Sequence, residues 1–221
     1  GIGQRLGRMR SKRKDRGVLV LLARKLRQNN DPAAAESIER GYAAQLRSIA
    51  ESIDDQFGDL EELLASQWLA LDQQVGPDAT GGSRTLRYQP DPETWGLWNS
   101  IRDALLGIRG DLETICRLND KACETVEDSA VSEDIKRSIL LELGGFGNRM
   151  ADYLAGFSRF NSLDDETQVR WLEYRAATGG KEGAKLGFSV APITVAQDLR
   201  NALFEALETV VLPSATLSVA G

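Results

Sequence analysis

Apolar residues in the first half of the chain follow a spacing that only a long helix can place on one face. Between residues 38 and 75 they recur at intervals of four, four and three. This period of about 3.67 residues per turn nearly equals that of a straight α-helix. We therefore expect one helix from about residue 34 to 75, roughly 60 Å long. The stripe consists of Ile38, Tyr42, Leu46, Ile49, Ile53, Phe57, Leu60, Leu64, Trp68, Leu71 and Val75.

Residues that typically begin a helix precede this helix and two others. Asp31 and Asp91 each stand before a proline, so the carboxylate accepts a backbone N–H at a position where proline has none to lose. A third helix begins at Ser132, with two acids in its first turn. Three long helices with one apolar face each predict an antiparallel bundle, and hence a mainly α fold. The later faces are Trp95, Trp98, Ile101, Leu105, Ile108, Leu112 and Ile115, then Ile135, Ile139, Leu143, Phe146, Met150, Tyr153 and Phe157.

Short strands are expected between and after the helices. "TLRYQ" (85–89) alternates, and "VRWLEYR" (169–175) and "KLGFSVAP" (185–192) flank a glycine-rich turn, which predicts a hairpin. Thr194 and Gln197 form a capping box for a short helix bearing Val195, Leu199, Leu203 and Leu207. The following "TVVL" (209–212) is apolar on both faces, as a central strand of a parallel sheet must be, so its partners lie elsewhere.

Composition excludes several function classes. The chain of 221 residues contains no histidine, which removes Ser-His-Asp, Cys-His and His-ligated zinc chemistry. Cys116 and Cys123 have no further cysteine or histidine partners, so we expect two reduced, partly buried thiols and no metal site. No run approaches the roughly 20 apolar residues of a membrane span, and the opening lacks the apolar core of a signal peptide. A cytoplasmic protein is expected.

Basic residues concentrate at the amino end. Residues 1–27 contain ten Lys or Arg and one acid, although the whole chain has a net charge of −6. Such a segment can bind a phosphate backbone through counterion release. The alternative is a solvated basic loop that keeps the protein soluble or pairs with its acidic helices. The candidate nucleic-acid-binding residues are Arg5, Arg8, Arg10, Lys12, Arg13, Lys14 and Arg16.

The carboxyl-terminal stretch "SVAPITVAQDLRNALFEALETVVLPSATLSVAG" resembles the segment of DinG/XPD-family DNA helicases that leads into motif III. In that family a Pro-Ile/Leu-Asp/Thr-Val phrase precedes a helix, an apolar strand and a Thr-Ser-Ala-Thr-Leu signature. The likeness is strong over residues 188–221. It is moderate over 84–187, which include "RYQPDPETWGLWNSI" and "VRWLEYR", and weak before that.

The resemblance implies an organisation in three parts. Residues 1–30 would be a basic arm, 31–165 a helical arch-like insertion, and 166–221 the returning edge of the first RecA-like motor domain. Ser214, Ala215 and Thr216 would be motif III, which couples ATP hydrolysis to movement on single-stranded DNA. Pro213 stands where the family usually has threonine. The chain would then be a fragment that ends on a strand of the motor domain, whose other parts would be its partners in cis.

The resemblance also implies ATP and Mg²⁺ as cofactors of the parent protein. No G-x-x-x-x-G-K-[ST] loop, D-E-A-H box or four-cysteine cluster motif occurs in this chain. We therefore expect the chain alone neither to bind ATP tightly nor to hydrolyse it. An iron–sulfur cluster in the parent, the polarity of unwinding and the oligomeric state are not specified by the sequence.

Two other functions are compatible with the same residues. The long helices could serve a self-standing module that binds a protein partner. The basic arm could bind nucleic acid without any motor, and binding would then survive deletion of everything after residue 30. An arch that guides single-stranded DNA requires its folded helices.

Overall fold

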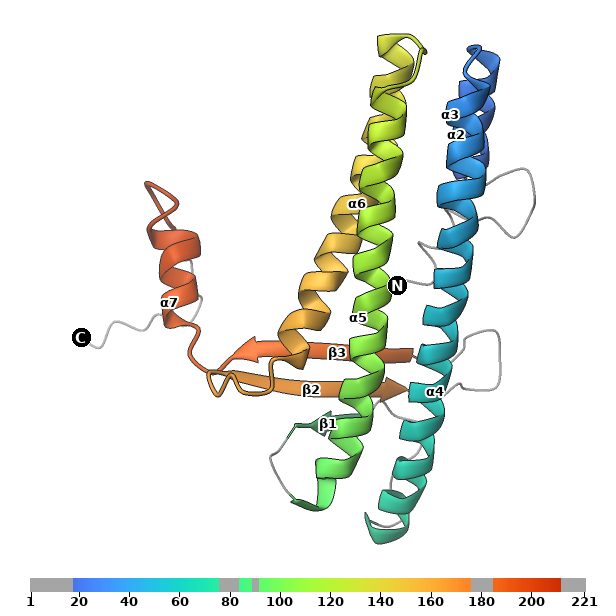
Figure 1. The fold of residues 1–221 in the computed structure, drawn as a ribbon. Helices are drawn as coiled ribbons and strands as arrows, with labels where there is room; N and C mark the ends of the chain where they lie inside the picture. Colours follow the sequence, from blue (N-terminus) through green and yellow to red (C-terminus); the bar gives the residue numbers. More distant parts are fainter. Residues whose placement is uncertain (1–17, 76–83, 89–91, 176–184, 212–221) are drawn as a thin grey trace.

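The computed structural model describes residues 18–75, 84–88, 92–175 and 185–211, and they form a helical assembly on a small sheet (Figure 1). The helices are α2 (Val18–Gln28), α3 (Pro32–Glu36), α4 (Ala44–Val75), α5 (Pro92–Glu127), α6 (Glu133–Asn161) and α7 (Ala196–Leu199). Two π-helical segments, η1 (Ser37–Ala43) and η2 (Arg200–Phe204), continue α3 and α7. The strands are β1 (Arg84–Arg87), β2 (Gln168–Arg175) and β3 (Lys185–Pro192). The prediction of a mainly α fold with a few short strands is confirmed.

The predicted first long helix is present, with one change of pitch. Asp31 caps it, and Asp31 Oδ1 accepts the N–H of Ala34 at 3.0 Å. From Pro32 the helical path continues through η1 into α4 and ends at Val75. The π turns of η1 were not predicted, because the apolar spacing through Ile38 and Tyr42 reads the same for an ordinary α-helix.

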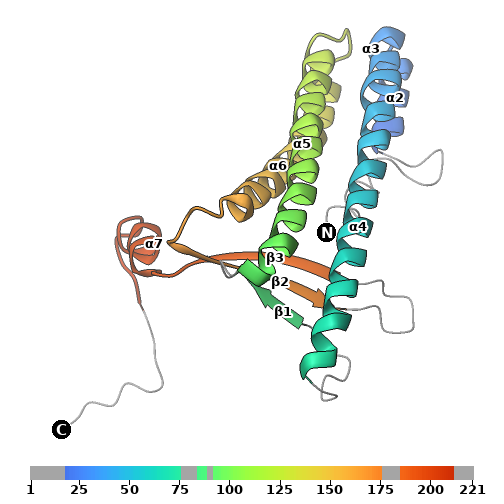
Figure 2. The same ribbon diagram turned by 60° about the horizontal axis from the view of Figure 1, so that its bottom comes forward.

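The predicted apolar faces meet in the core. Helices α4, α5 and α6 run side by side, with α6 antiparallel to α5 (Figures 1 and 2). Ile49, Phe57, Ile135 and Tyr153 are half-buried at the edge of this core. The side chains of Trp68, Leu71, Val75 and Trp95 lie outside those described. All other members of the three stripes are buried: Ile38, Tyr42, Leu46, Ile53, Leu60, Leu64, Trp98, Ile101, Leu105, Ile108, Leu112, Ile115, Ile139, Leu143, Phe146, Met150 and Phe157.

The sheet joins segments that are far apart in the sequence. The predicted hairpin is confirmed, since β2 pairs with β3 in antiparallel register from Gln168–Pro192 to Arg175–Lys185. β1 pairs antiparallel with the other edge of β2, which gives the order β1-β2-β3. Because β1 belongs to the predicted arch and β2 to the predicted motor edge, the sheet connects these two parts of the chain.

The carboxyl end differs from the prediction. Val195, not Thr194, is the N-cap of α7, and no side chain caps it, so the predicted capping box is wrong. Thr209, Val210 and Val211 have no regular secondary structure, and residue 212 lies outside the described residues. A central strand needs neighbours on both edges to satisfy its backbone, and no described strand lies beside this segment. The RecA-like ending is therefore not confirmed.

One glycine in α6 is required by a close approach to α5. A Cβ on Gly147 would lie 2.6 Å from Nδ2 of Asn119. Asn119 is buried, and its Oδ1 accepts a hydrogen bond from the Tyr42 hydroxyl at 3.2 Å. The amide therefore cannot move aside without breaking a buried hydrogen bond between η1 and α5.

Replacing Gly147 with alanine is therefore expected to destabilise the protein, although alanine is the better helix former. We expect the free energy of unfolding to fall by about 1–2 kcal/mol. Gly144→Ala is the matched control, because nothing lies within 4 Å of its Cβ position. That variant should gain about 0.5–1 kcal/mol. Urea unfolding measures both, and a gain in stability for Gly147→Ala would contradict the contact.

Candidate functional site

The residues predicted to carry function lie outside the described residues. This holds for the seven basic residues from Arg5 to Arg16 and for Ser214, Ala215 and Thr216. The structure describes the two elements that lead to them, which are α2 at the amino end and α7 with η2 at the carboxyl end.

Helix α2 belongs to the core, although its residues fall within the predicted basic arm. Four of its apolar side chains are buried, whereas Leu21, Arg24 and Lys25 are exposed. This helix was not predicted, although apolar residues recur at intervals of three and four within the basic segment and indicate a buried helical face. The buried side chains are Leu19, Leu22, Ala23 and Leu26.

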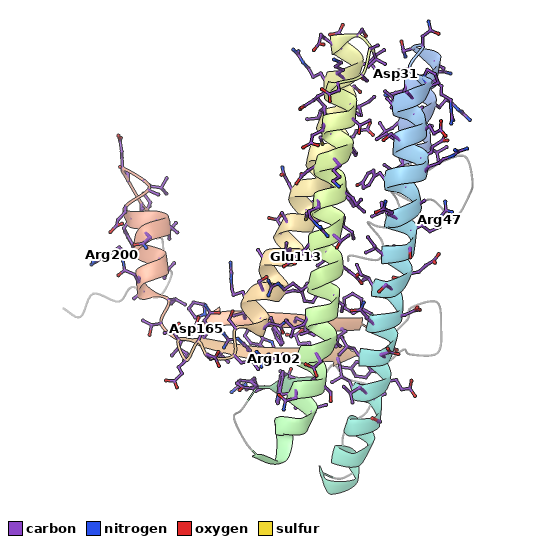
Figure 3. All side chains as sticks on the ribbon, viewed as in Figure 1. Asp31, Arg47, Arg102, Glu113, Asp165 and Arg200 are labelled. Atoms are coloured by element: carbon purple, nitrogen blue, oxygen red, sulfur yellow. The ribbon has the colours of Figure 1, made fainter. Side chains whose placement is uncertain are left out.

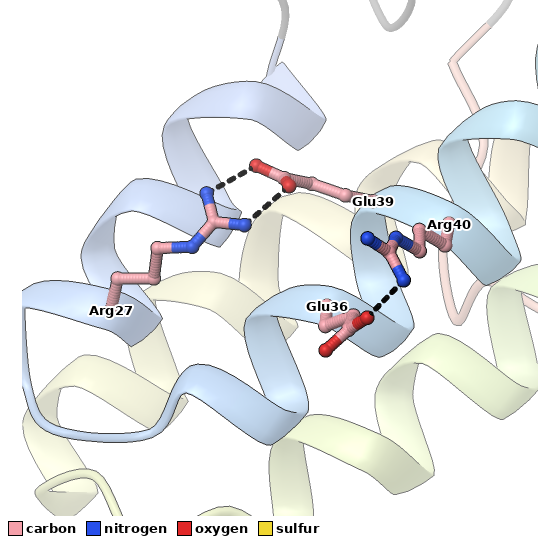
Figure 4. Close-up of polar contacts among 4 residues, drawn as sticks. All are labelled: Arg27, Glu36, Glu39 and Arg40. Atoms are coloured by element: carbon pink, nitrogen blue, oxygen red, sulfur yellow. Dashed lines mark hydrogen bonds and ion pairs between the residues drawn. The ribbon is translucent and has the colours of Figure 1, made fainter.

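An ion pair fixes α2 to the π-helical segment. The Arg27 guanidinium donates two hydrogen bonds to the Glu39 carboxylate, at 2.7 and 2.5 Å (Figure 4). This bidentate contact lowers the pKa of Glu39 and raises that of Arg27. Nearby, Arg40 pairs with Glu36 at 2.5 Å. Arg27 is thus already engaged within the protein, so of the basic residues in α2 only Arg24 and Lys25 remain for an outside partner.

Asp31 connects two turns that lie at the same end of the helical assembly (Figure 3). Its Oδ1 caps α3, and its Oδ2 accepts the N–H of Ala130, in the turn between α5 and α6, at 2.8 Å. Both backbone donors favour the ionised form, and they lower the pKa of Asp31, with the Ala34 contact the stronger cause. One carboxylate therefore both starts a helix and joins two hairpin turns.

This arrangement predicts a pH-dependent contribution to stability. Because the folded-state pKa of Asp31 lies below its unfolded value, the contribution is complete above the unfolded value near pH 4 and is lost as pH falls through the folded value. Asp31→Ala should lower the unfolding free energy by about 1 kcal/mol at pH 7. Asp31→Asn keeps an acceptor for the cap but has only one oxygen. The measurement is the difference in unfolding free energy between the wild type and Asp31→Asn, determined at pH 7 and at pH 3. A difference that is larger at pH 3 than at pH 7 would contradict the prediction.

A buried arginine fixes the turn between α6 and the sheet. Arg170 is 2% exposed. Its guanidinium donates to the carbonyl oxygens of Ser162, Asp165 and Gln168. Asp165 in turn accepts from the hydroxyl and N–H of Thr167, which lower its pKa. The direction in which the hairpin leaves the helices thus depends on Arg170.

The element after this hairpin exposes apolar side chains. Helix α7 and η2 stand apart from the helical assembly in both ribbon views, and Arg200 marks this segment in Figure 3. None of its described residues is buried. We call these side chains the α7 apolar face: Ile193, Val195, Leu199, Phe204 and Leu207, each 45–63% exposed. Large apolar side chains exposed together on one segment normally pack against another element.

The outer surface of α4 is acidic. Six carboxylate side chains between residues 51 and 62 are exposed, and no basic residue lies among them. Such a surface repels a phosphate backbone. Any nucleic acid bound by this protein is therefore expected on another face. The acids are Glu51, Asp54, Asp55, Asp59, Glu61 and Glu62.

Cys116 and Cys123 are free and half-buried, as predicted. Burial is the main cause that raises the pKa of each thiol, and neighbouring carboxylates raise it further. Neutral thiols are poor nucleophiles and metal ligands. In the part of the chain that the structure describes, no group of three or more Cys, Asp or Glu residues is placed to hold a metal ion.

Comparisons with known proteins give no match: no family model, curated protein or solved structure is significantly similar to this chain. Within the described residues, no helix has both the length and the apolar character needed to cross a membrane.

Proposed function

We propose that this chain is the helical arm of a DinG/XPD-type ATP-dependent DNA helicase, together with the edge of the motor domain that carries it. The single observation that supports this most is the α7 apolar face. It lies in the stretch 188–221 that resembles the approach to motif III, and it directly precedes the candidate residues Ser214, Ala215 and Thr216.

The α7 apolar face fits this role because its neighbours would be elements of the motor domain. Leu199 and Phe204 are 45% and 55% exposed, although both are large apolar side chains on one short helical segment. Packing them against a sheet would remove this apolar surface from water. In the proposed helicase, α4, α5 and α6 form the arm that guides single-stranded DNA, and the hairpin fixed by Arg170 joins the arm to the motor.

ATP and Mg²⁺ would be bound by other parts of the parent protein. The residues of this chain do not fit a nucleotide site, since no Walker A loop is present and the described residues form no cluster suited to a metal. The pure chain is therefore expected to show no DNA-stimulated ATP hydrolysis. Measurable turnover would contradict this part of the proposal.

The decisive test is the DNA that flanks the coding region, read in frame for several hundred bases on each side. A Walker A loop and an acidic box upstream, with a second motor domain downstream, would support the proposal. A start codon immediately before Gly1 and a stop codon immediately after Gly221 would overturn it. A self-standing helical binding module would then be the better description.

Hydrogen exchange provides an independent test of the α7 apolar face. In the longer polypeptide, residues 195–207 should be protected, whereas in the present chain they should exchange rapidly. Residues 101–115 of α5 serve as the internal control, because this helix buries Ile101, Leu105, Ile108, Leu112 and Ile115 in both cases. Equal exchange of residues 195–207 in the two polypeptides would contradict docking on the motor.

A further inference from the structure

One face of the three-stranded sheet is covered by the helices. On that face Leu172 and Tyr174 of β2 are buried, and Phe188 of β3 contacts Phe157 and Phe160 of α6 with ring centroids 5.7 and 5.3 Å apart. Side chains alternate along a strand, so the intervening residues must lie on the opposite face. Figure 2 shows the three strands side by side near the lower ends of α5 and α6.

The opposite face carries an aromatic side chain at its centre. Trp171 of the middle strand pairs with Arg87 of β1 and with Ser189 of β3, so these three side chains form one row across the sheet. Arg87 is exposed and Trp171 is half-buried. Trp171 Nε1 donates to Glu173 Oε1 at 2.9 Å, which holds the indole along the strand direction.

The neighbours of Trp171 on the adjacent strand β3 are small. β3 presents only Gly187, Ser189 and Ala191 there, which are small residues. Val169, two residues before Trp171, is 38% exposed. Within the row, Arg87 is exposed, and Trp171 and Ser189 are half-buried, so part of the indole remains accessible to solvent.

The charge of the strands differs in sign from that of the protein. The net charge of the chain is −6, yet β1, β2 and β3 contain five Lys or Arg residues and one acid, Glu173. The carboxylate of Glu173 accepts the indole N–H. Arg170, one of the five, is buried on the helix side, whereas Arg87 makes no hydrogen bond or ion pair with another described residue. Arg87 therefore has its donors available beside Trp171.

We propose that this sheet face binds single-stranded DNA, with one base stacked on Trp171 and a phosphate held by Arg87. An aromatic ring beside a free cation is the combination that binds single strands without sequence preference. The choice of DNA as the ligand rests on the proposed function. The location does not, because it follows from the strand register, which places the exposed Arg87 beside Trp171.

The test uses the full chain and two labelled 15-mers, oligo(dT) and an abasic strand with the same number of phosphates. Fluorescence anisotropy should show that the wild type binds oligo(dT) about 5- to 150-fold more tightly than the abasic strand, which is the range expected for stacking of one base. Trp171→Leu should abolish this preference, and Trp171→Phe should retain most of it. Thermal unfolding checks that both variants are folded.

Arg87→Gln should weaken binding to both strands and make the dependence of log Kd on log salt shallower by about 0.7. Arg47→Gln is the matched control, because Arg47 is exposed on α4, away from the sheet (Figure 3). Equal losses for the two arginine variants would overturn the role of Arg87. A preference for oligo(dT) that survives in Trp171→Leu, or no DNA binding at all, would overturn the stacking site. Neither result depends on the flanking coding sequence, which tests the motor separately.

Discussion

Arg170→Ala is expected to lower the free energy of unfolding by about 3 kcal/mol. The side chain is almost fully buried and donates to three carbonyl oxygens in and beside the turn that joins α6 to β2. Alanine leaves these acceptors without their donor and creates a cavity under the sheet. Both effects act on the same turn, so the orientation of the hairpin relative to the helices should loosen together with the global stability.

Two further variants separate hydrogen bonding from packing at this position. Arg170→Met keeps most of the volume but supplies no donor, so it should recover only the packing part of the loss. Arg159→Ala is the matched control, because Arg159 is exposed in the last turn of α6 and should change stability by less than about 0.5 kcal/mol. Urea unfolding measures all three variants. Equal stabilities for Arg170→Ala and Arg159→Ala would show that the buried guanidinium is not required.

Trp98→Ala is expected to cost about 3–5 kcal/mol. Trp98 of α5 is 2% exposed and packs against both the sheet and α6. Its ring meets Tyr88, next to β1, edge-on at 5.1 Å between centroids, and Phe160 of α6 at 6.4 Å. Removing the indole therefore leaves a cavity where the helices contact the sheet.

Trp98→Phe provides the contrast. Nε1 of Trp98 is buried and has no hydrogen-bond partner among the described residues, so phenylalanine removes an unsatisfied donor while keeping an aromatic ring. We expect a loss of less than about 1.5 kcal/mol. Thermal and urea unfolding compare the two variants. A loss for phenylalanine as large as that for alanine would contradict this expectation, because it would show that an aromatic ring at this position is not sufficient without the full indole.

The elements that the sequence predicted correctly are those specified by neighbouring residues. The stripe from Ile38 to Leu64, the cap at Asp31 and the helix start at Ser132 depend only on residues a few positions apart. The hairpin of β2 and β3 was recognised from two strands around a glycine-rich turn for the same reason. The short capping box at Thr194 failed, because four helical residues without packing partners do not fix their own start.

The candidate binding surface was not predicted. Trp171 and Arg87 are 84 positions apart, and the strand that contains Arg87 was recognised without its partner. The pairing of β1 with β2 brings the two side chains into one row. The alternation in "VRWLEYR" predicts that Trp171 and Leu172 lie on opposite faces of the strand. It does not indicate which of these faces the helices cover.

The long amphipathic helices and the hairpin follow from the sequence alone, because helical and strand periods are local properties of the chain. The packing of α2 into the core, the contact of Asp31 with Ala130 across 99 positions and the burial of Arg170 became visible only in the folded protein. Those outcomes depend on which apolar faces meet and in what register. Contacts between distant segments form only when the packing of the whole chain brings their donors and acceptors within about 3 Å of each other.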